Sequence, residues 1–128
     1  MLVDRFGNAF QQLPKEGVEV DTGLKWIDGR PIYRSYKKIE LGQTVSGSAN
    51  IGGSNFDYFF IDSSLSCVWS ANPDTPGDYF FYPVNYGSID GTRTVCFLSI
   101  DTIQVGLSEN FSGWTNTFYI NYLYVKKN

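Results

Sequence analysis

Short apolar and aromatic runs alternate along the chain with clusters of turn-forming residues. Turn signals recur every eight to fifteen residues, with no helical interval between them. The clearest run is 102–107, where Ile103, Val105 and Leu107 alternate with polar or small residues, as in a strand with one wet face. This pattern predicts an all-β protein, an antiparallel β-sandwich of jelly-roll-like type, and not a set of βαβ units.

Other runs predict further strands. We expect strands at 32–41, 55–62, 79–82, 93–100 and 117–125, with 65–69 pairing with 55–62 across Ser63-Ser64. Residues 42–55 predict a loop or a weak strand, and 71–78, with two prolines and a glycine, predict a loop. Residues 1–19 show no sustained period and are interpreted as a stalk-like connector, or alternatively as a frayed terminus. Residues 20–128 then form one β-sandwich domain, as the length of 128 residues suggests.

The expected last strand is apolar on both faces. One face carries Phe118, Ile120, Tyr122 and Tyr124, and the other carries Tyr119, Leu123 and Val125, interrupted by Asn121. Because an antiparallel strand of a monomer usually keeps one polar face, this strand needs cover on both sides. Either the sheets bend around it or a neighbouring subunit covers it, and the second alternative predicts an oligomer.

The segment 23–34 combines an aromatic anchor, Trp26, with a turn pair, Asp28-Gly29, and a strand start at Pro31. We expect Asp28 and Gly29 to supply the two positive φ angles of a two-residue hairpin turn. Pro31 lacks an N–H and therefore suits the start of a strand or a sheet edge.

This segment resembles a "TGxxWIDGKPIYRK"-like stretch of the C-terminal domains of phage tail-fibre and baseplate proteins. The matching residues are Thr22, Gly23, Trp26, Ile27, Asp28, Gly29, Pro31, Ile32, Tyr33 and Arg34, with Arg30 in place of the usual lysine. Residues 81–84 are similar to an aromatic-Pro-apolar element of that family, and 112–127 resemble its closing pattern, although Val125 stands where threonine is frequent. The order and spacing fit over residues 20–128.

The resemblance implies a homotrimeric, β-rich tip domain that contacts a receptor on the host surface, commonly a saccharide. It implies a virion component made in the host cytoplasm, and it brings no catalytic residues. The shared residues Trp26, Asp28, Gly29, Pro31 and Tyr33 are expected to serve the fold. The alternatives are a structural trimerisation cap without receptor contact, a monomeric carbohydrate-binding module, and a depolymerase fragment.

Charge and composition narrow the function classes. The formal net charge is −3, which argues against a nucleic-acid binder and against attachment to an anionic membrane surface. No apolar run reaches membrane-spanning length and no signal peptide is visible, so we expect no membrane insertion. Cys67 and Cys96 both lie in apolar stretches, which favours two buried free thiols over a disulfide.

The absence of histidine removes Ser-His and Cys-His catalysis and any histidine-based metal site. Carboxylates could still form a glycosidase pair, but most of the candidates flank turns, where aspartate caps the backbone. These candidates are Asp57, Asp62, Asp74, Asp78, Asp90, Asp101 and Glu109. A calcium loop from Asn72, Asp74 and Asp78 matches no EF-hand spacing. We therefore expect no enzyme, no metal and no cofactor.

The most distinctive component is 22 aromatic residues, made up of 10 Phe, 9 Tyr and 3 Trp. Most should lie in the core, but rings beside polar loops could stack on sugars. The candidate ligand-binding residues are Trp69, Asn72, Asp74, Tyr79, Tyr86, Asp90, Trp114 and Asn116. The alternative for each ring is that it plugs a loop onto the core.

Overall fold

The computed structural model describes the backbone of residues 15–86, 95–99 and 101–128, and the side chains of 15–84 and 101–128. The described part contains β-strands, short 3-10 turns and no α-helix, which confirms the all-β prediction. The strands are β1 (Val20–Lys25), β2 (Pro31–Gly42), β3 (Ser46–Asn50), β4 (Phe56–Ile61), β5 (Cys67–Ala71), β6 (Tyr79–Pro83), β7 (Asn85–Tyr86), β8 (Val95–Ser99), β9 (Thr102–Gly106) and β10 (Thr115–Lys126).

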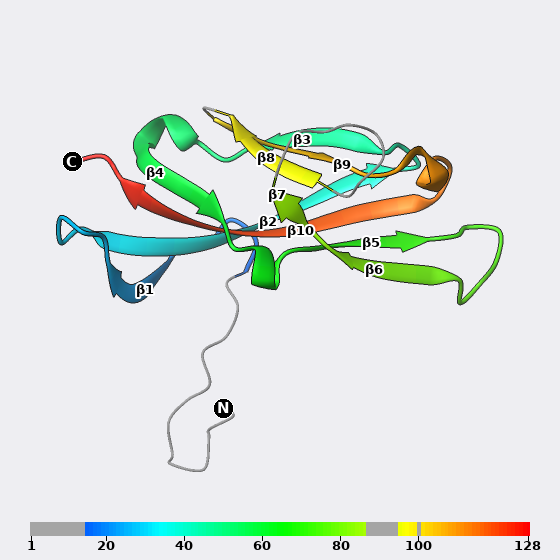
Figure 1. Ribbon diagram of the computed structural model, residues 1–128, viewed down its shortest axis with the longest axis horizontal. Helices are drawn as coiled ribbons and strands as arrows, with labels where there is room; N and C mark the ends of the chain where they lie inside the picture. Colours follow the sequence, from blue (N-terminus) through cyan, green and yellow to red (C-terminus); the bar gives the residue numbers. More distant parts are fainter. Residues whose placement is uncertain (1–14, 87–94, 100) are drawn as a thin grey trace, which may run out of the picture.

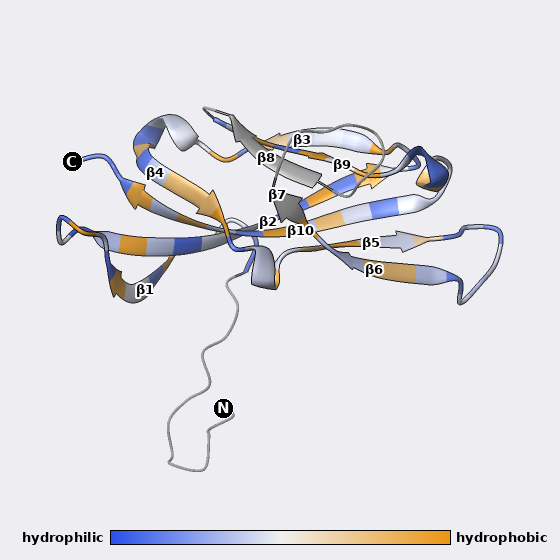
Figure 2. Cartoon of the chain, in the orientation of Figure 1, coloured by the Kyte–Doolittle hydropathy of each residue, from blue (hydrophilic) through white to orange (hydrophobic). Residues whose placement is uncertain are grey.

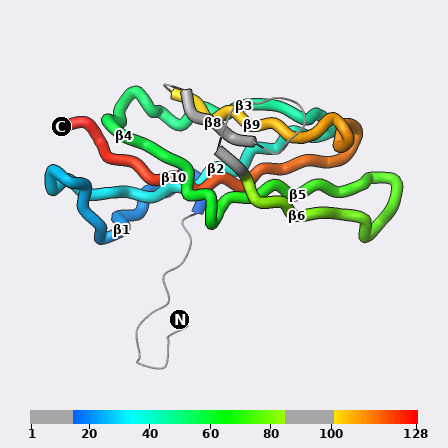
Figure 3. The backbone as a smooth tube through the Cα atoms, viewed as in Figure 1, coloured from blue at the N-terminus to red at the C-terminus, as the bar shows by residue number. Residues whose placement is uncertain are grey.

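The larger sheet is built around β10, which runs the length of the molecule to the C-terminus (Figure 3). Its strand order is β1-β2-β10-β5-β6, and β4 also pairs with β10. On one side β10 pairs with β2 from Gly42 to Tyr33, while on the other side its first half pairs with β5 and its second half with β4. The predicted pairing of 55–62 with 65–69 is therefore wrong, because both strands bond to β10, one after the other.

The smaller sheet has the order β3-β9-β8-β7 and lies above the right half of the larger one in Figure 1. Its pairs are antiparallel except for the two-residue contact of β7 with β8, which is parallel. The weak strand expected within 42–55 is β3. Residues of both sheets form one buried cluster: Ile39, Val68, Phe118, Ile120, Tyr122 and Tyr124 from the larger sheet, with Ile103, Val105 and nearby Val84 and Leu107.

Strand β10 obtains cover on one face, and part of its cover on the other, within a single chain. Phe118 and Ile120 face the buried cluster, and Val125, on the opposite face, is also fully buried. Asn121, which interrupts the second face in the sequence, is buried, and hydrogen bonds offset part of the cost: its amide donates to the carbonyl of Leu65 and its N–H donates to the hydroxyl of Ser66. The chain supplies part of this cover itself, through its 3-10 turn (Ser63–Leu65), while Tyr119 and Leu123 of the second face are only half-buried. Cover of that face by a neighbouring subunit therefore stays a prediction.

The turn between β1 and β2 differs from the expected two-residue turn. Trp26 donates its N–H to the carbonyl of Arg30 at 2.8 Å, and Gly29 donates to Trp26 at 2.9 Å. Gly29 has φ +90°, but Asp28 does not have a positive φ. The loop is therefore a three-residue hairpin connection in which only the glycine enters the left-handed region. The Asp28 carboxylate pairs with Arg30 at 2.7 Å, and Trp26 stacks on Tyr58 with ring centroids 4.8 Å apart.

Residues 15–19, the described part of the predicted connector, lie against the domain. Gly17 donates to the carbonyl of Tyr36 at 3.0 Å, and Glu19 accepts hydrogen bonds from Tyr124 and Lys126. Partial burial raises the pKa of Glu19, but the hydrogen bonds from Lys126 and Tyr124 outweigh this effect, so the pKa lies below its usual value. Glu19 thus ties the chain before β1 to the end of β10.

Candidate functional site

The β5–β6 hairpin carries two of the predicted binding residues, Trp69 and Tyr79, on the same face of the larger sheet. Their ring centroids lie 6.5 Å apart. Phe81 belongs to the same face, with its ring 6.1 Å from that of Tyr79 in a T-shaped arrangement, and it pairs directly with Trp69 across the strands. We call Trp69, Tyr79 and Phe81 the aromatic platform.

The platform is the most exposed aromatic surface on a strand among the described residues. Tyr79 is 53% and Phe81 63% exposed, whereas Trp69 is half-buried between its neighbours. The smaller sheet covers the opposite face of β5, where Val68 is fully buried in the cluster shared by both sheets. No described strand covers the face that carries the platform. Figure 2 shows the hydrophobic stretch in the middle of β6 at the lower edge of the molecule.

Phe81 was missed in the sequence because the tripeptide Phe80-Phe81-Tyr82 carries aromatics at consecutive positions. The signal that could have found it is the period of two, which places Tyr79 and Phe81 together and Phe80 and Tyr82 on the other face. Which of these faces is covered depends on the second sheet, and the local sequence does not encode that.

The predicted residues Trp114 and Asn116 lie on the other side of the hairpin, away from the platform. Trp114 stacks on Phe80 at 5.7 Å and meets Phe111 at 5.1 Å in a perpendicular arrangement. Asn116 is fully buried, and its amide donates to the carbonyls of Thr44 and Phe111 at 2.9 and 3.1 Å. These contacts show that Asn116 holds two loops together, and that the Trp114 ring packs its loop onto the hairpin.

The loop of the hairpin uses its polar groups internally. The Asn72 side chain accepts from the N–H of Asp74 at 3.0 Å and donates to the carboxylate of Asp78 at 3.1 Å. In the part of the chain that has described side chains, no group of three or more Asp, Glu, Cys or His could hold a metal ion. Asn72 and Asp78 therefore shape the turn that brings Tyr79 back beside β5.

Two predicted residues cannot be assigned to this surface. Tyr86 ends β7, but its side chain is outside the described set, and Asp90 lies outside the described residues altogether. The side chain of Cys96 is likewise outside that set. Cys67 is a free, half-buried thiol in the row next to Trp69, and burial raises its pKa, which keeps it protonated and poorly reactive near neutral pH.

Two of the candidate carboxylates, in β4 and directly after it, are engaged in ion pairs. Asp57 pairs with Arg30, and Asp62 pairs with Arg34 at 3.0 Å. Both pairs join segments that are distant in sequence, which is a structural use of these groups. Asp101 and Glu109 lie at a turn before β9 and in the 3-10 turn before β10, respectively.

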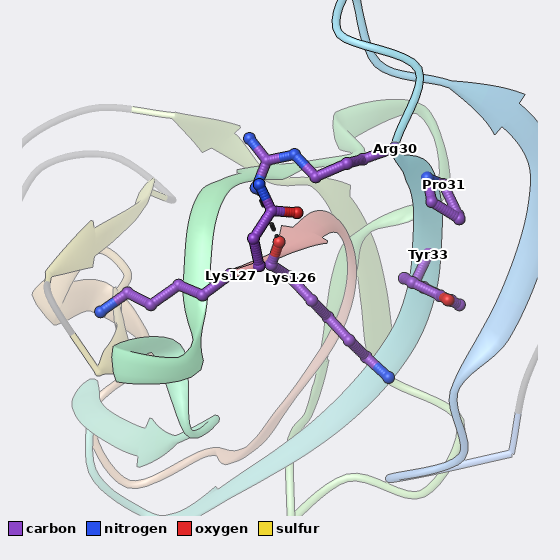
Figure 4. A pocket seen from close by; sticks show the side chains of 6 residues that line it. Arg30, Pro31, Tyr33, Lys126 and Lys127 are labelled. Atoms are coloured by element: carbon purple, nitrogen blue, oxygen red, sulfur yellow. Dashed lines mark hydrogen bonds between the residues drawn. The ribbon is translucent and has the colours of Figure 1, made fainter.

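A shallow pocket lies at the opposite end of the molecule, between the start of β2 and the end of the chain (Figure 4). It encloses about 130 Å³ and is lined by Arg30, Pro31, Tyr33, Lys126, Lys127 and Asn128. Ligand pockets usually measure roughly 300 to 1,000 Å³. Arg30 donates to the carbonyl of Lys126 and pairs with Asp28 and Asp57, while the ammonium of Lys126 pairs with Glu19 and lies 4.5 Å from the Tyr33 ring. Two of its three cations are thus already neutralised, and the pocket is too small to be favoured over the platform.

Comparisons with known proteins add no family. No protein-family model matches the chain, and neither a curated protein nor a solved structure matches it. No helix in the described residues is long and apolar enough to cross a membrane.

Proposed function

We propose that this chain is a non-enzymatic receptor-binding tip domain of a phage tail-fibre or baseplate protein, and that it binds a saccharide of the host surface. The observation that carries the proposal is the exposed aromatic platform of Trp69, Tyr79 and Phe81 on paired strands. Aromatic faces pack against the C–H groups of sugar rings, and the Tyr79 hydroxyl offers a polar group for orientation.

The resemblance of residues 20–128 to tip domains supports the biological setting of this proposal. Two sheets with one shared core support the further proposal that the fold is a jelly-roll-like β-sandwich. The residues that carry the resemblance make fold contacts, such as the stack of Trp26 on Tyr58 and of Tyr33 on Tyr124, which fits a scaffold that carries a separate binding surface. Such a domain would belong to the virion.

The charges near the platform favour an uncharged or amino sugar over an acidic one. The hairpin, residues 67–83, contains Asp74 and Asp78 but no lysine or arginine. Glu40 lies in the same cross-strand row as Trp69 and Phe81, separated from them by Thr117. Lys38, two residues before Glu40 on the same face, pairs with Glu40 at 2.9 Å. An anionic saccharide would therefore meet repulsion that nothing on the hairpin offsets.

The resemblance implies a homotrimer, and the half-buried Tyr119 and Leu123 of β10 offer a surface for it. This assembly is the alternative to the two-fold pairing proposed below, and saccharide binding by the platform requires neither. A structural cap without receptor contact and a monomeric carbohydrate-binding module are the competing functions. The cap predicts no saccharide binding, whereas the module predicts binding by a monomer.

The test measures binding of the whole chain to an array of neutral, amino and acidic oligosaccharides. Trp69→Thr removes the inner ring of the platform and keeps a residue that suits a strand. Leu24→Thr, on the exposed part of β1, is the matched control. We expect binding to neutral or amino sugars, a loss of at least tenfold in Trp69→Thr, and unchanged binding in Leu24→Thr.

Thermal melting of both variants shows whether the fold is kept. No binding to any saccharide, or full binding by a folded Trp69→Thr variant, would overturn the assignment of the platform. Preferred binding of acidic sugars would contradict the charge argument alone.

A further inference from the structure

Strand β6 is an edge of the larger sheet, and its free side can be identified from the hydrogen-bond pattern. Asn72 donates its N–H to Asp78 at 2.8 Å, and Val84 donates to Ser66 at 3.2 Å. Hydrogen-bonded pairs alternate with non-bonded pairs in an antiparallel ladder. The pairs Ser70–Phe80 and Val68–Tyr82 between these two therefore bond across the hairpin. The backbone groups of Tyr79, Phe81 and Pro83 point to the opposite, free side.

The same residues therefore present unpaired backbone groups and exposed aromatic rings. Among the described residues no strand pairs with this side of β6. The strand Tyr-Phe-Phe-Tyr-Pro contains no charge and its pairing with β5 shows no register shift, so of the usual devices that prevent edge pairing it has only its short length and Pro83. A bare edge of this composition is a template for another strand.

We propose that β6 pairs in antiparallel fashion with β6 of a second copy of this chain. The antiparallel register centred on Phe81 is the one in which all five residues overlap. In it, each Phe81 N–H donates to the Phe81 carbonyl of the other copy, and each Tyr79 N–H donates to the Pro83 carbonyl of the other copy. Pro83, which has no N–H, is needed only as an acceptor in this register.

Charge and area both favour this occupant. Antiparallel pairing keeps the acidic loops with Asp74 and Asp78 at opposite ends of the joint, whereas parallel pairing would bring them together. Tyr79, Phe80 and Phe81 are 53%, 44% and 63% exposed, which leaves about 300 Å² of aromatic surface per copy. Two copies contribute roughly 600 Å² from these side chains, and the backbone edge with Pro83 brings the joint toward the roughly 1,000 Å² of a biological contact. The pair should accordingly be weak and depend on concentration.

Pairing would also enlarge the proposed binding surface. Phe81 of each copy would lie beside that of the other, so the two platforms would form one aromatic strip with a Trp69 at each end. This consequence rests on the proposed function, whereas the pairing itself does not. A two-fold contact closes after two copies and cannot by itself build a three-fold tip, so the mass of the assembly separates the two arrangements.

The experiment is light scattering with size-exclusion chromatography over a wide concentration series without saccharide. Phe81→Lys places two like charges at the centre of the joint, while the bonds of β6 to β5 do not involve residue 81. Leu24→Lys is the matched control, because Leu24 is 62% exposed on the opposite edge strand. We expect the wild type and Leu24→Lys to approach twice the monomer mass, and Phe81→Lys to associate at least tenfold more weakly.

A wild type that stays monomeric at all concentrations, one that forms trimers, or a Phe81→Lys variant that associates as well as the wild type would overturn the pairing. If Phe81→Lys fails to fold, oxidative cross-linking decides. In a Cys67→Ser/Cys96→Ser background, Phe81→Cys should give a disulfide-linked dimer and Leu24→Cys should not; failure of the first would overturn the pairing. Trp69→Thr should lose saccharide binding and keep the dimer, which separates failure of the function from failure of the joint.

Discussion

The two edge strands of the larger sheet, β1 and β6, differ in how they protect their free backbone edge against pairing with another strand. β1 contains Asp21 and Lys25, and its pairing with β2 is irregular between them. Gly23, inside that irregularity, has φ +80°. β6 has neither charge nor irregularity and exposes aromatic rings. The two strands lie at opposite ends of the sheet in Figure 1.

By this difference β1 is a protected edge and β6 is an open one. Charges and an irregular register on β1 discourage the approach of another strand. β6 belongs to the same sheet but has neither charges nor an irregular register. Its exposed aromatic surface is therefore better explained by a binding role than by chance. The comparison therefore supports the proposal that the binding surface lies at the β6 end of the molecule.

The largest expected effect on stability comes from a substitution in the buried cluster between the two edge strands. Phe118 is fully buried on β10, opposite Ile39 of β2 and Val68 of β5. Phe118→Ala should lower the free energy of unfolding by about 3 to 5 kcal/mol, because it removes buried contacts and leaves a cavity. Urea denaturation measures this loss. Phe81→Ala should cost far less, since that ring is mostly in water; equal losses would mean that β6 is not an open edge.

A smaller effect separates the two hairpins. Gly29 and Gly77, in the turns beside β1 and β6, have φ +90° and +86°, and a Cβ added at either would meet no atom within 4 Å. Replacement by alanine should therefore cost about 1 to 2 kcal/mol through backbone strain alone. Hydrogen exchange should show Gly29→Ala weakening the β1–β2 end and Gly77→Ala weakening β5–β6. Loss of protection at both ends from either variant would show that the two edges are coupled.

The smallest expected effect is a pH dependence of the stability, and it arises from Glu19 on the β1 side of the molecule. The pKa of Glu19 is lowered: burial acts to raise it, but hydrogen bonds from Lys126 and Tyr124 act more strongly in the opposite direction. A lowered pKa in the folded state stabilises the fold above the unfolded pKa, and this stabilisation disappears as pH falls through the folded value. Glu19→Gln should thus be slightly less stable than the wild type at pH 7, with a smaller difference at pH 3.

Denaturation midpoints at the two pH values check this effect. A difference that stays the same at pH 7 and pH 3 would show that packing of the side chain, and not its charge, matters. Because Glu19 is partly exposed, salt should also reduce the difference at pH 7.

Local chemistry accounts for the parts of the fold that the sequence predicted well. The two prolines and Gly77 between residues 71 and 78 ended β5 and opened the loop, and Pro83 ended β6 where expected. The alternation of Ile103 and Val105 marked β9. The turn at Asp28-Gly29 was located correctly, but its length was wrong, because Trp26 and Arg30 close the ladder one residue further out than a two-residue turn allows. Of the predicted binding residues, Trp69 and Tyr79 lie together in the structure, whereas Trp114 and Asn116 lie on another face.

Turn residues and the two-residue period sufficed to locate most of the strands and to show which side chains share a face. The sequence did not show that β4 and β5 succeed each other along β10, that Asn121 is buried under the Ser63–Leu65 turn, or that Phe81 is left in water. The physical reason is that pairing and cover come from segments far away in the chain. A pattern shows that a face needs cover, but only packing decides whether the same chain supplies it.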